Sequence, residues 1–173
     1  MEFLETLSKL EPLAAFVGAH SWVWPGCEIL HFFGMSLLVG TVALLDLRML
    51  GVVKDLPLTA VHRLIPFALI GFAVNLATGL VFLFGDPFME PGGHFQNITF
   101  VLKMCFILGA GLNAIAFYAV PGTHEMIAKL DAGADAPRRA KMTAATSLVL
   151  WIGVIYLGRM LPYTDAFYFV FHW

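Results

Sequence analysis

The chain has 173 residues, of which 60% are hydrophobic and 13% are charged, and its formal net charge is −2. A soluble domain needs far more polar surface than this composition supplies, so the composition excludes a water-soluble globular protein. The length fits a single transmembrane domain over residues 1–173.

The first predicted element is an amphipathic helix over residues 2–19. Apolar side chains recur there at helical spacing between acidic and other polar residues, and the segment is too polar to cross a bilayer. We expect this helix to lie on the outer face of the membrane that the protein spans, at the interface between lipid and water.

Four apolar segments follow, over residues 25–50, 64–84, 100–120 and 143–161. Each is long enough to cross a hydrocarbon core about 30 Å thick as a helix, which takes about 20 residues. Only helices or closed barrels satisfy the backbone in lipid, and these segments lack strand alternation. The prediction is therefore an all-α integral membrane four-helix bundle in contact with the lipid bilayer.

Lysine and arginine in the short links predict the orientation of this bundle. The second link carries neither residue, whereas the first and third links carry seven: Arg48, Lys54, Arg63, Lys129, Arg138, Arg139 and Lys141. Both basic links are therefore predicted to be cytoplasmic, with the N- and C-termini outside. Because topology explains these charges, no nucleic-acid partner is expected.

Ionisable side chains are costly inside a membrane and often mark a functional site. On the first span, Glu28, His31, Met35 and Asp46 share one helical face. Gly34 lies one turn from His31, and we expect its missing side chain to leave room for a large, flat ligand.

Lys103 and Arg159 lie near the outer ends of the third and fourth spans. With the predicted orientation, they occupy the same outer layer as Glu28 and His31. One interpretation is an ion-pair network whose cations extend outward to the interface. The other is a cofactor site in which His31 ligates a metal and Lys103 or Arg159 pairs with carboxylates, such as haem propionates.

Three further histidines are candidates for cofactor binding. His20 and His94 are possible second metal ligands beside His31, although each could also be an ordinary loop histidine. His62 opens the second span at the cytoplasmic end, facing Asp46 and Arg48, where a histidine with arginines could hold a second porphyrin. The alternative for His62 is that it caps a helix and meets lipid phosphates.

The segment from Trp24 to Arg48 reads WPGCEILHFFGMSLLVGTVALLDLR. It resembles an uncharacterised family of small bacterial inner-membrane proteins, and the likeness covers nearly the whole chain. More remotely, HRLIPFALIGFAVNLATGLVFLF and LKMCFILGAGLNAIAFY are similar to the second and third spans of CopD-type copper-resistance proteins and HemJ-type protoporphyrinogen oxidases. In the HemJ type, a first-span histidine and a third-span lysine are tied to haem and activity, so the resemblance implies this role for His31 and Lys103.

Three functions are compatible with these observations. The favoured one is a cytochrome b-like protein of the bacterial inner membrane that holds one haem b, or two, for electron transport or redox chemistry at the periplasmic side. Its expected redox partner is a quinone or a periplasmic protein, and an activity as a haem-dependent oxidoreductase stays open.

The second is a copper-handling membrane protein that binds metal through His31, Met35, Cys27 and Cys105. The two cysteines are otherwise expected to be buried free thiols. The third is a structural or accessory subunit without catalysis. Small residues along the spans also predict a homo-oligomer.

Overall fold

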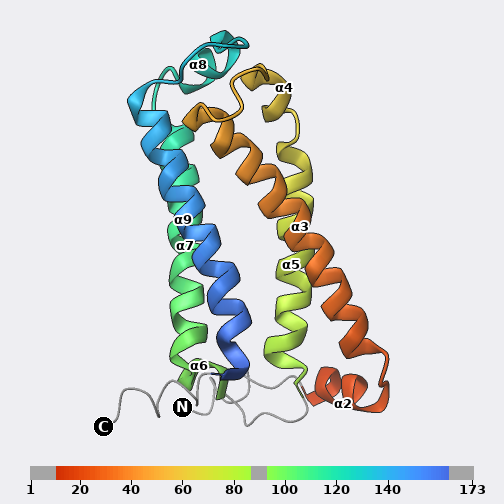
Figure 1. Ribbon diagram of the computed structural model, residues 1–173. Helices are drawn as coiled ribbons and strands as arrows, with labels where there is room; N and C mark the ends of the chain where they lie inside the picture. The colour runs from red at the N-terminus through yellow and green to blue at the C-terminus, as the bar shows by residue number, and fades with distance from the viewer. Residues whose placement is uncertain (1–10, 87–92, 164–173) are drawn as a thin grey trace, which may run out of the picture.

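Four long helices run alongside one another in the computed structural model, which describes residues 11–86 and 93–163 (Figure 1). The elements are α2 (Glu11–Ala19), α3 (Val23–Leu50), α4 (Leu58–His62), α5 (Ile65–Phe84), α6 (Gly93–Gln96), α7 (Ile98–Ala119), α8 (Thr123–Lys129), α9 (Arg138–Met160) and the 3-10 turn η1 (Leu161–Tyr163). The described residues contain no strand, which confirms the predicted all-α bundle. We call the end that carries α4 and α8 the α8 end, and the opposite end, with α2 and α6, the α6 end.

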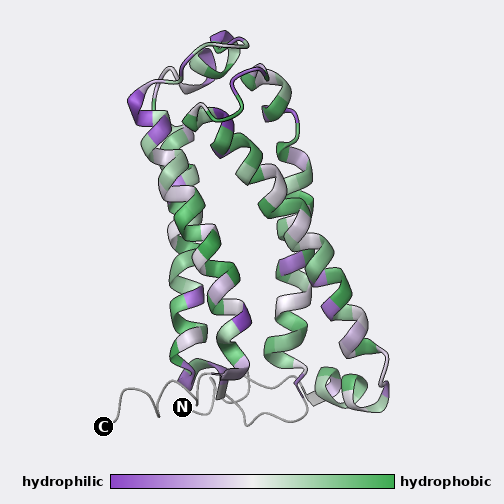
Figure 2. Cartoon of the chain, in the orientation of Figure 1, coloured by the Kyte–Doolittle hydropathy of each residue, from purple (hydrophilic) through white to green (hydrophobic). Residues whose placement is uncertain are grey.

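The helices α3, α5, α7 and α9 belong to four segments that are long and apolar enough to cross a membrane. Three of them match the predicted spans closely, whereas α9 begins at Arg138 instead of residue 143. Pro137 has extended backbone angles (φ −63°, ψ 155°) and caps this helix, so the charged residues that follow form its first turns. Figure 2 shows apolar residues along the long helices and hydrophilic residues gathered at the α8 end.

The predicted N-terminal helix is present over its described part, as α2. Residues 2–10 of that prediction, and the aromatic tail over residues 165–173, lie outside the described residues. Helix α2 packs against the end of α5, where a side chain added to Gly85 would meet Val17 at 3.1 Å and Leu13 at 3.4 Å. This contact fixes the turn that leads from α2 into α3.

The long helices form two closely packed pairs, α3 with α5 and α7 with α9, and α3 joins the pairs by packing against α9. The α3–α5 pair is closest at Gly34 and Gly71. A Cβ added to Gly34 would lie 2.9 Å from the Gly71 carbonyl oxygen, and a Cβ added to Gly71 would lie 2.5 Å from the Gly34 carbonyl oxygen. The expectation that Gly34 leaves room for a flat ligand is therefore wrong, because the backbone of α5 fills that space.

At the α8 end, the buried guanidinium of Arg48 joins the two loops that link the helices. Its Nε donates to the carbonyl of Leu56, its Nη1 to Ala134 at 3.2 Å and its Nη2 to Asp131 at 2.7 Å. Arg48 lies in the last turn of α3, where a cation also interacts favourably with the helix dipole. Helix α3 ends at Gly51, whose positive φ of 89° permits the left-handed cap.

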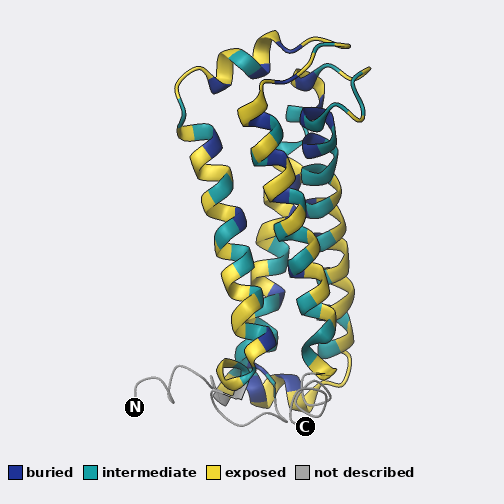
Figure 3. Ribbon diagram, turned by 60° about the vertical axis from the view of Figure 1, so that its left-hand side comes forward, coloured by how far each residue is buried: buried dark blue, intermediate teal, exposed yellow. Residues whose placement is uncertain are grey.

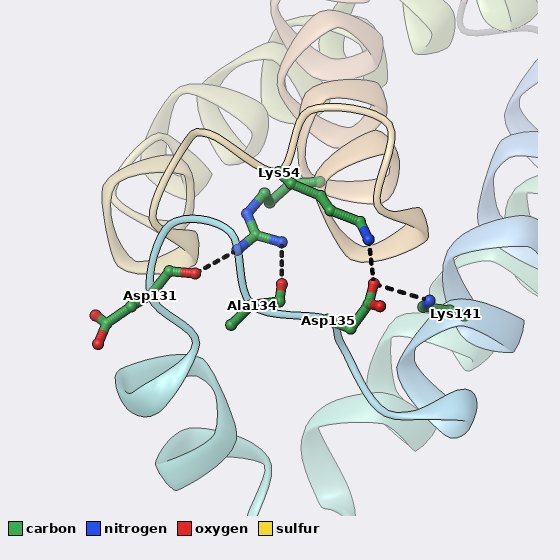
Figure 4. A network of polar contacts seen from close by, with 6 residues as sticks. Lys54, Asp131, Ala134, Asp135 and Lys141 are labelled. Atoms are coloured by element: carbon green, nitrogen blue, oxygen red, sulfur yellow. Dashed lines mark hydrogen bonds and ion pairs between the residues drawn. The ribbon is translucent and has the colours of Figure 1, made fainter.

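The same loops are held together by ionic and backbone contacts (Figure 4). The carboxylate of Asp135 accepts from Lys54 at 2.9 Å and from Lys141 at 3.1 Å. The Gly133 amide donates to the Lys54 carbonyl at 2.8 Å. Positive charges that were predicted to set topology therefore also tie the α3–α5 pair to the α7–α9 pair.

The apolar core is concentrated at this end of the bundle. It contains Leu45, Met49, Leu58, Val61, Phe117, Ile127, Leu130, Ala136, Ala140 and Ala144. Along the rest of the long helices, many apolar side chains are exposed (Figure 3). Such faces are expected of helices in contact with lipid.

Candidate functional site

His31 lies half-buried between α3 and α5, where its imidazole contacts Thr78. The ring Nδ1 is 2.7 Å from the Thr78 hydroxyl oxygen, and that hydroxyl donates to the Val74 carbonyl at 2.8 Å. When the Thr78 hydrogen is donated to the Val74 carbonyl, the hydroxyl oxygen accepts the proton of Nδ1. In this tautomer of His31, the lone pair of Nε2 is free to bind a metal.

The ring of Phe82 packs against His31 on the side toward the α6 end. The His31 and Phe82 ring centroids are 5.5 Å apart, and Phe82 lies 5.1 Å from Trp24. The indole of Trp24 donates to the Glu28 carboxylate at 3.2 Å. Trp24, Glu28 and His31 follow one another at about one turn along α3, and Thr78 and Phe82 do so along α5. The register set by Gly34 and Gly71 brings these two sets of residues together.

Like His31 on α3, Lys103 on α7 lies in the half of its helix toward the α6 end. Its half-buried ammonium is 3.5 Å from the position that a Cβ of Gly158 would take. No carboxylate within the described ranges forms an ion pair with Lys103. The next residue after Gly158, Arg159, is exposed and stacks over Tyr163 at 6.0 Å. The predicted ion-pair network with Glu28 is thus not formed among these side chains.

His20 and His94 lie at the α6 end, where their ring nitrogens are near groups other than His31, and Nε2 of His94 has no hydrogen-bond partner among the described residues. The Nδ1 of His20, in the turn between α2 and α3, contacts the Phe16 carbonyl at 2.9 Å. In α6, the Nε2 of His94 is 3.9 Å from a carboxylate oxygen of Asp86. Figure 1 places α2 beside α3 and α5, and α6 beside α7 and α9. Neither histidine is brought against His31 by a contact of the described residues.

His62 lies at the α8 end, far along the bundle from His31. Its Nε2 is 3.1 Å from the hydroxyl of Tyr118, and the two rings meet edge to face. Arg48 binds loop carbonyls instead of contributing to a site around His62. The hydrogen bonds that His62 and Arg48 form in the structure are thus made to other parts of the same chain.

The copper ligands proposed from the sequence are dispersed. Cys27 is half-buried, whereas Cys105 is exposed, so the expectation that both thiols are buried is wrong for Cys105. Across the part of the chain that the structure describes, no three His, Cys, Asp or Glu side chains are grouped to hold a metal ion. A ligand set at His31 would therefore rest on one imidazole.

Sequence reasoning missed Thr78 and Phe82, the two α5 residues that contact His31. Thr78 is a buried polar residue in a mainly apolar helix, and its position before Gly79 could have drawn attention to it. Its pairing with His31 depends on the α3–α5 register, which the sequence does not specify.

No protein-family model, curated protein or solved structure matches this chain. The arrangement of His31, Thr78 and Lys103 in a membrane-spanning bundle is therefore the basis on which its function is inferred.

Proposed function

We propose that the protein binds one b-type haem through His31 and acts in electron transfer within the bacterial inner membrane. The observation that carries this proposal is the hydrogen bond between His31 Nδ1 and Thr78. Histidines that ligate metals usually donate their other ring nitrogen to a fixed acceptor, which sets the tautomer and orients the ring. Thr78 supplies this acceptor, and the Nε2 of His31 is the nitrogen that would hold the iron.

Lys103 supports the proposal because its cation has no carboxylate partner among the described residues. A half-buried ammonium in an apolar span is costly, and an anionic ligand at the same depth would offset that cost. Haem propionates are such anions. Arg159 is exposed and follows Gly158 in the chain. It would pair with the other haem propionate, and its own side chain would not have to be buried.

When bound, the haem would supply reversible one-electron chemistry of its iron. The protein's own contribution is to hold the imidazole of His31 in one tautomer and to surround it with apolar rings such as Phe82. If the haem takes a second ligand, His20, His94 or a small molecule would supply it. The expected redox partner is a quinone or a periplasmic protein.

The visible spectrum of the purified protein tests this proposal. Protein purified from haem-sufficient cells should show a haem Soret band, with a reduced spectrum typical of a b-type haem, at one haem per chain. Lys103→Met should weaken haem retention, whereas Lys129→Met, which removes an exposed lysine at the α8 end, should not. A colourless wild-type preparation would refute the proposal.

A further inference from the structure

Asp46 on α3 is a buried carboxyl group that the proposed haem site does not use. Its exposed fraction is 2%, and among the described residues its Oδ2 has no hydrogen-bond partner. Among the described residues, the Ser147 hydroxyl on α9 hydrogen-bonds to this carboxyl group. No described cation pairs with it, and the nearest along the chain, Arg48, donates to loop carbonyls. The carboxyl therefore lies between two helices with one oxygen available.

Other titratable groups connect Asp46 to the surface of the α8 end. From α7, Tyr118 packs against the core that contains Leu45, the residue before Asp46 on α3. The Tyr118 hydroxyl is 3.1 Å from Nε2 of His62, which contributes from α4. The Tyr118 ring is also 6.1 Å from the ring of His124, an exposed residue of α8. Groups that both donate and accept protons thus extend from the buried carboxyl toward solution.

We propose that Asp46 is a proton-binding site that exchanges protons with the solution at the α8 end through Tyr118 and His62. In the uptake direction, Nδ1 of His62 takes a proton from a hydronium ion, which leaves as water, and Nε2 of His62 donates its proton to the Tyr118 oxygen. The phenol proton of Tyr118 moves, directly or through one water, to the carboxylate of Asp46. One proton is transferred in total, and the His62 tautomer and the Tyr118 hydroxyl must reorient before the next transfer.

Infrared difference spectroscopy between two pH values tests the proposal in the intact protein. The wild-type spectrum should contain a carboxylic C=O band that Asp46→Asn abolishes. Asp55→Asn, which changes an exposed aspartate in the neighbouring loop, should leave the band unchanged. Ser147→Ala should shift the frequency of the band, since the Ser147 hydroxyl is hydrogen-bonded to this carboxyl. This second variant keeps Asp46 in place and so does not depend on how well the Asn variant folds.

The route is tested by the rate at which the band responds to a pH jump. Tyr118→Phe should slow this response about tenfold or more, because it removes one proton carrier from the path. A difference spectrum that is unchanged in Asp46→Asn would overturn the site. A response to sodium at fixed pH, with none to pH, would overturn the identity of the ligand. Equal rates in Tyr118→Phe and wild type would overturn the route. None of these outcomes depends on haem.

Discussion

Replacing Gly71 with alanine should separate α3 from α5 and disturb His31. The new Cβ would lie 2.5 Å from the Gly34 carbonyl oxygen and 2.7 Å from the Leu38 amide nitrogen, whereas ordinary contact begins at 3.4 Å. Both near atoms belong to the backbone, so the helices must move apart by about 1 Å to restore normal contact.

The energetic effect follows from this displacement. Overpacking of this kind typically costs about 1–3 kcal/mol, and the helix-forming advantage of alanine over glycine returns about 0.5–1 kcal/mol. A net loss of stability of about 1–2 kcal/mol is therefore expected. The same movement would lengthen the 2.7 Å His31–Thr78 contact beyond hydrogen-bonding range.

Gly79→Ala is the matched control, because the same helix offers nothing within 4 Å of a Cβ at that position. Denaturation of both variants in detergent, followed by circular dichroism, measures the difference. Gly71→Ala should unfold more easily than wild type, and Gly79→Ala should be equal or slightly more stable. Equal stability of the two variants would refute the close α3–α5 contact from which the site geometry is derived.

Three further predictions concern the site and the loops. Thr78→Val should leave the fold intact but lower haem affinity by about tenfold or more, measured by haem titration, because Nδ1 of His31 loses its acceptor; unchanged affinity would contradict the assigned tautomer. Arg48→Ala should destabilise the protein by about 3 kcal/mol or more, because buried carbonyls lose a charged donor, whereas exposed Arg63→Ala should have little effect in the same denaturation assay. Lys54 and Lys141 hold the pKa of the exposed Asp135 below its ordinary value. The ion pairs of Asp135 therefore stabilise the protein fully above about pH 4, and this stabilisation is lost as pH falls further. The difference in melting temperature between wild type and Asp135→Asn should accordingly disappear in strong acid, and a constant difference would show that the ion pairs do not cause it.

The four spans could be predicted from hydropathy because an apolar stretch of bilayer length has few other structures. The start of α9 could not be predicted in this way, because its first turns carry Arg138, Arg139 and Lys141. A search for apolar stretches leaves such charged residues out. In the structure, Pro137 is the N-cap that sets this boundary. The start of α7 at Ile98 similarly depends on Asn97, whose side chain accepts from the Thr99 and Phe100 amides.

The candidate site was predictable one residue at a time. His31 and Lys103 attract attention because ionisable groups are rare in apolar spans. Thr78 could not be assigned to His31, since that pairing depends on how closely Gly34 and Gly71 let two helices approach. Arg48 was predicted as a topological charge and as part of the cytoplasmic set around His62. Its bonds to Ala134 and Asp131 could not be predicted, because those carbonyls lie in a loop distant in sequence.

The haem content of two histidine variants tests the central claim most directly. His31→Ala and His62→Ala should be purified alongside wild type from haem-sufficient cells, and the bound haem measured per chain. The account predicts that His31→Ala is colourless, while His62→Ala retains the wild-type haem content. Full haem retention in folded His31→Ala would contradict it.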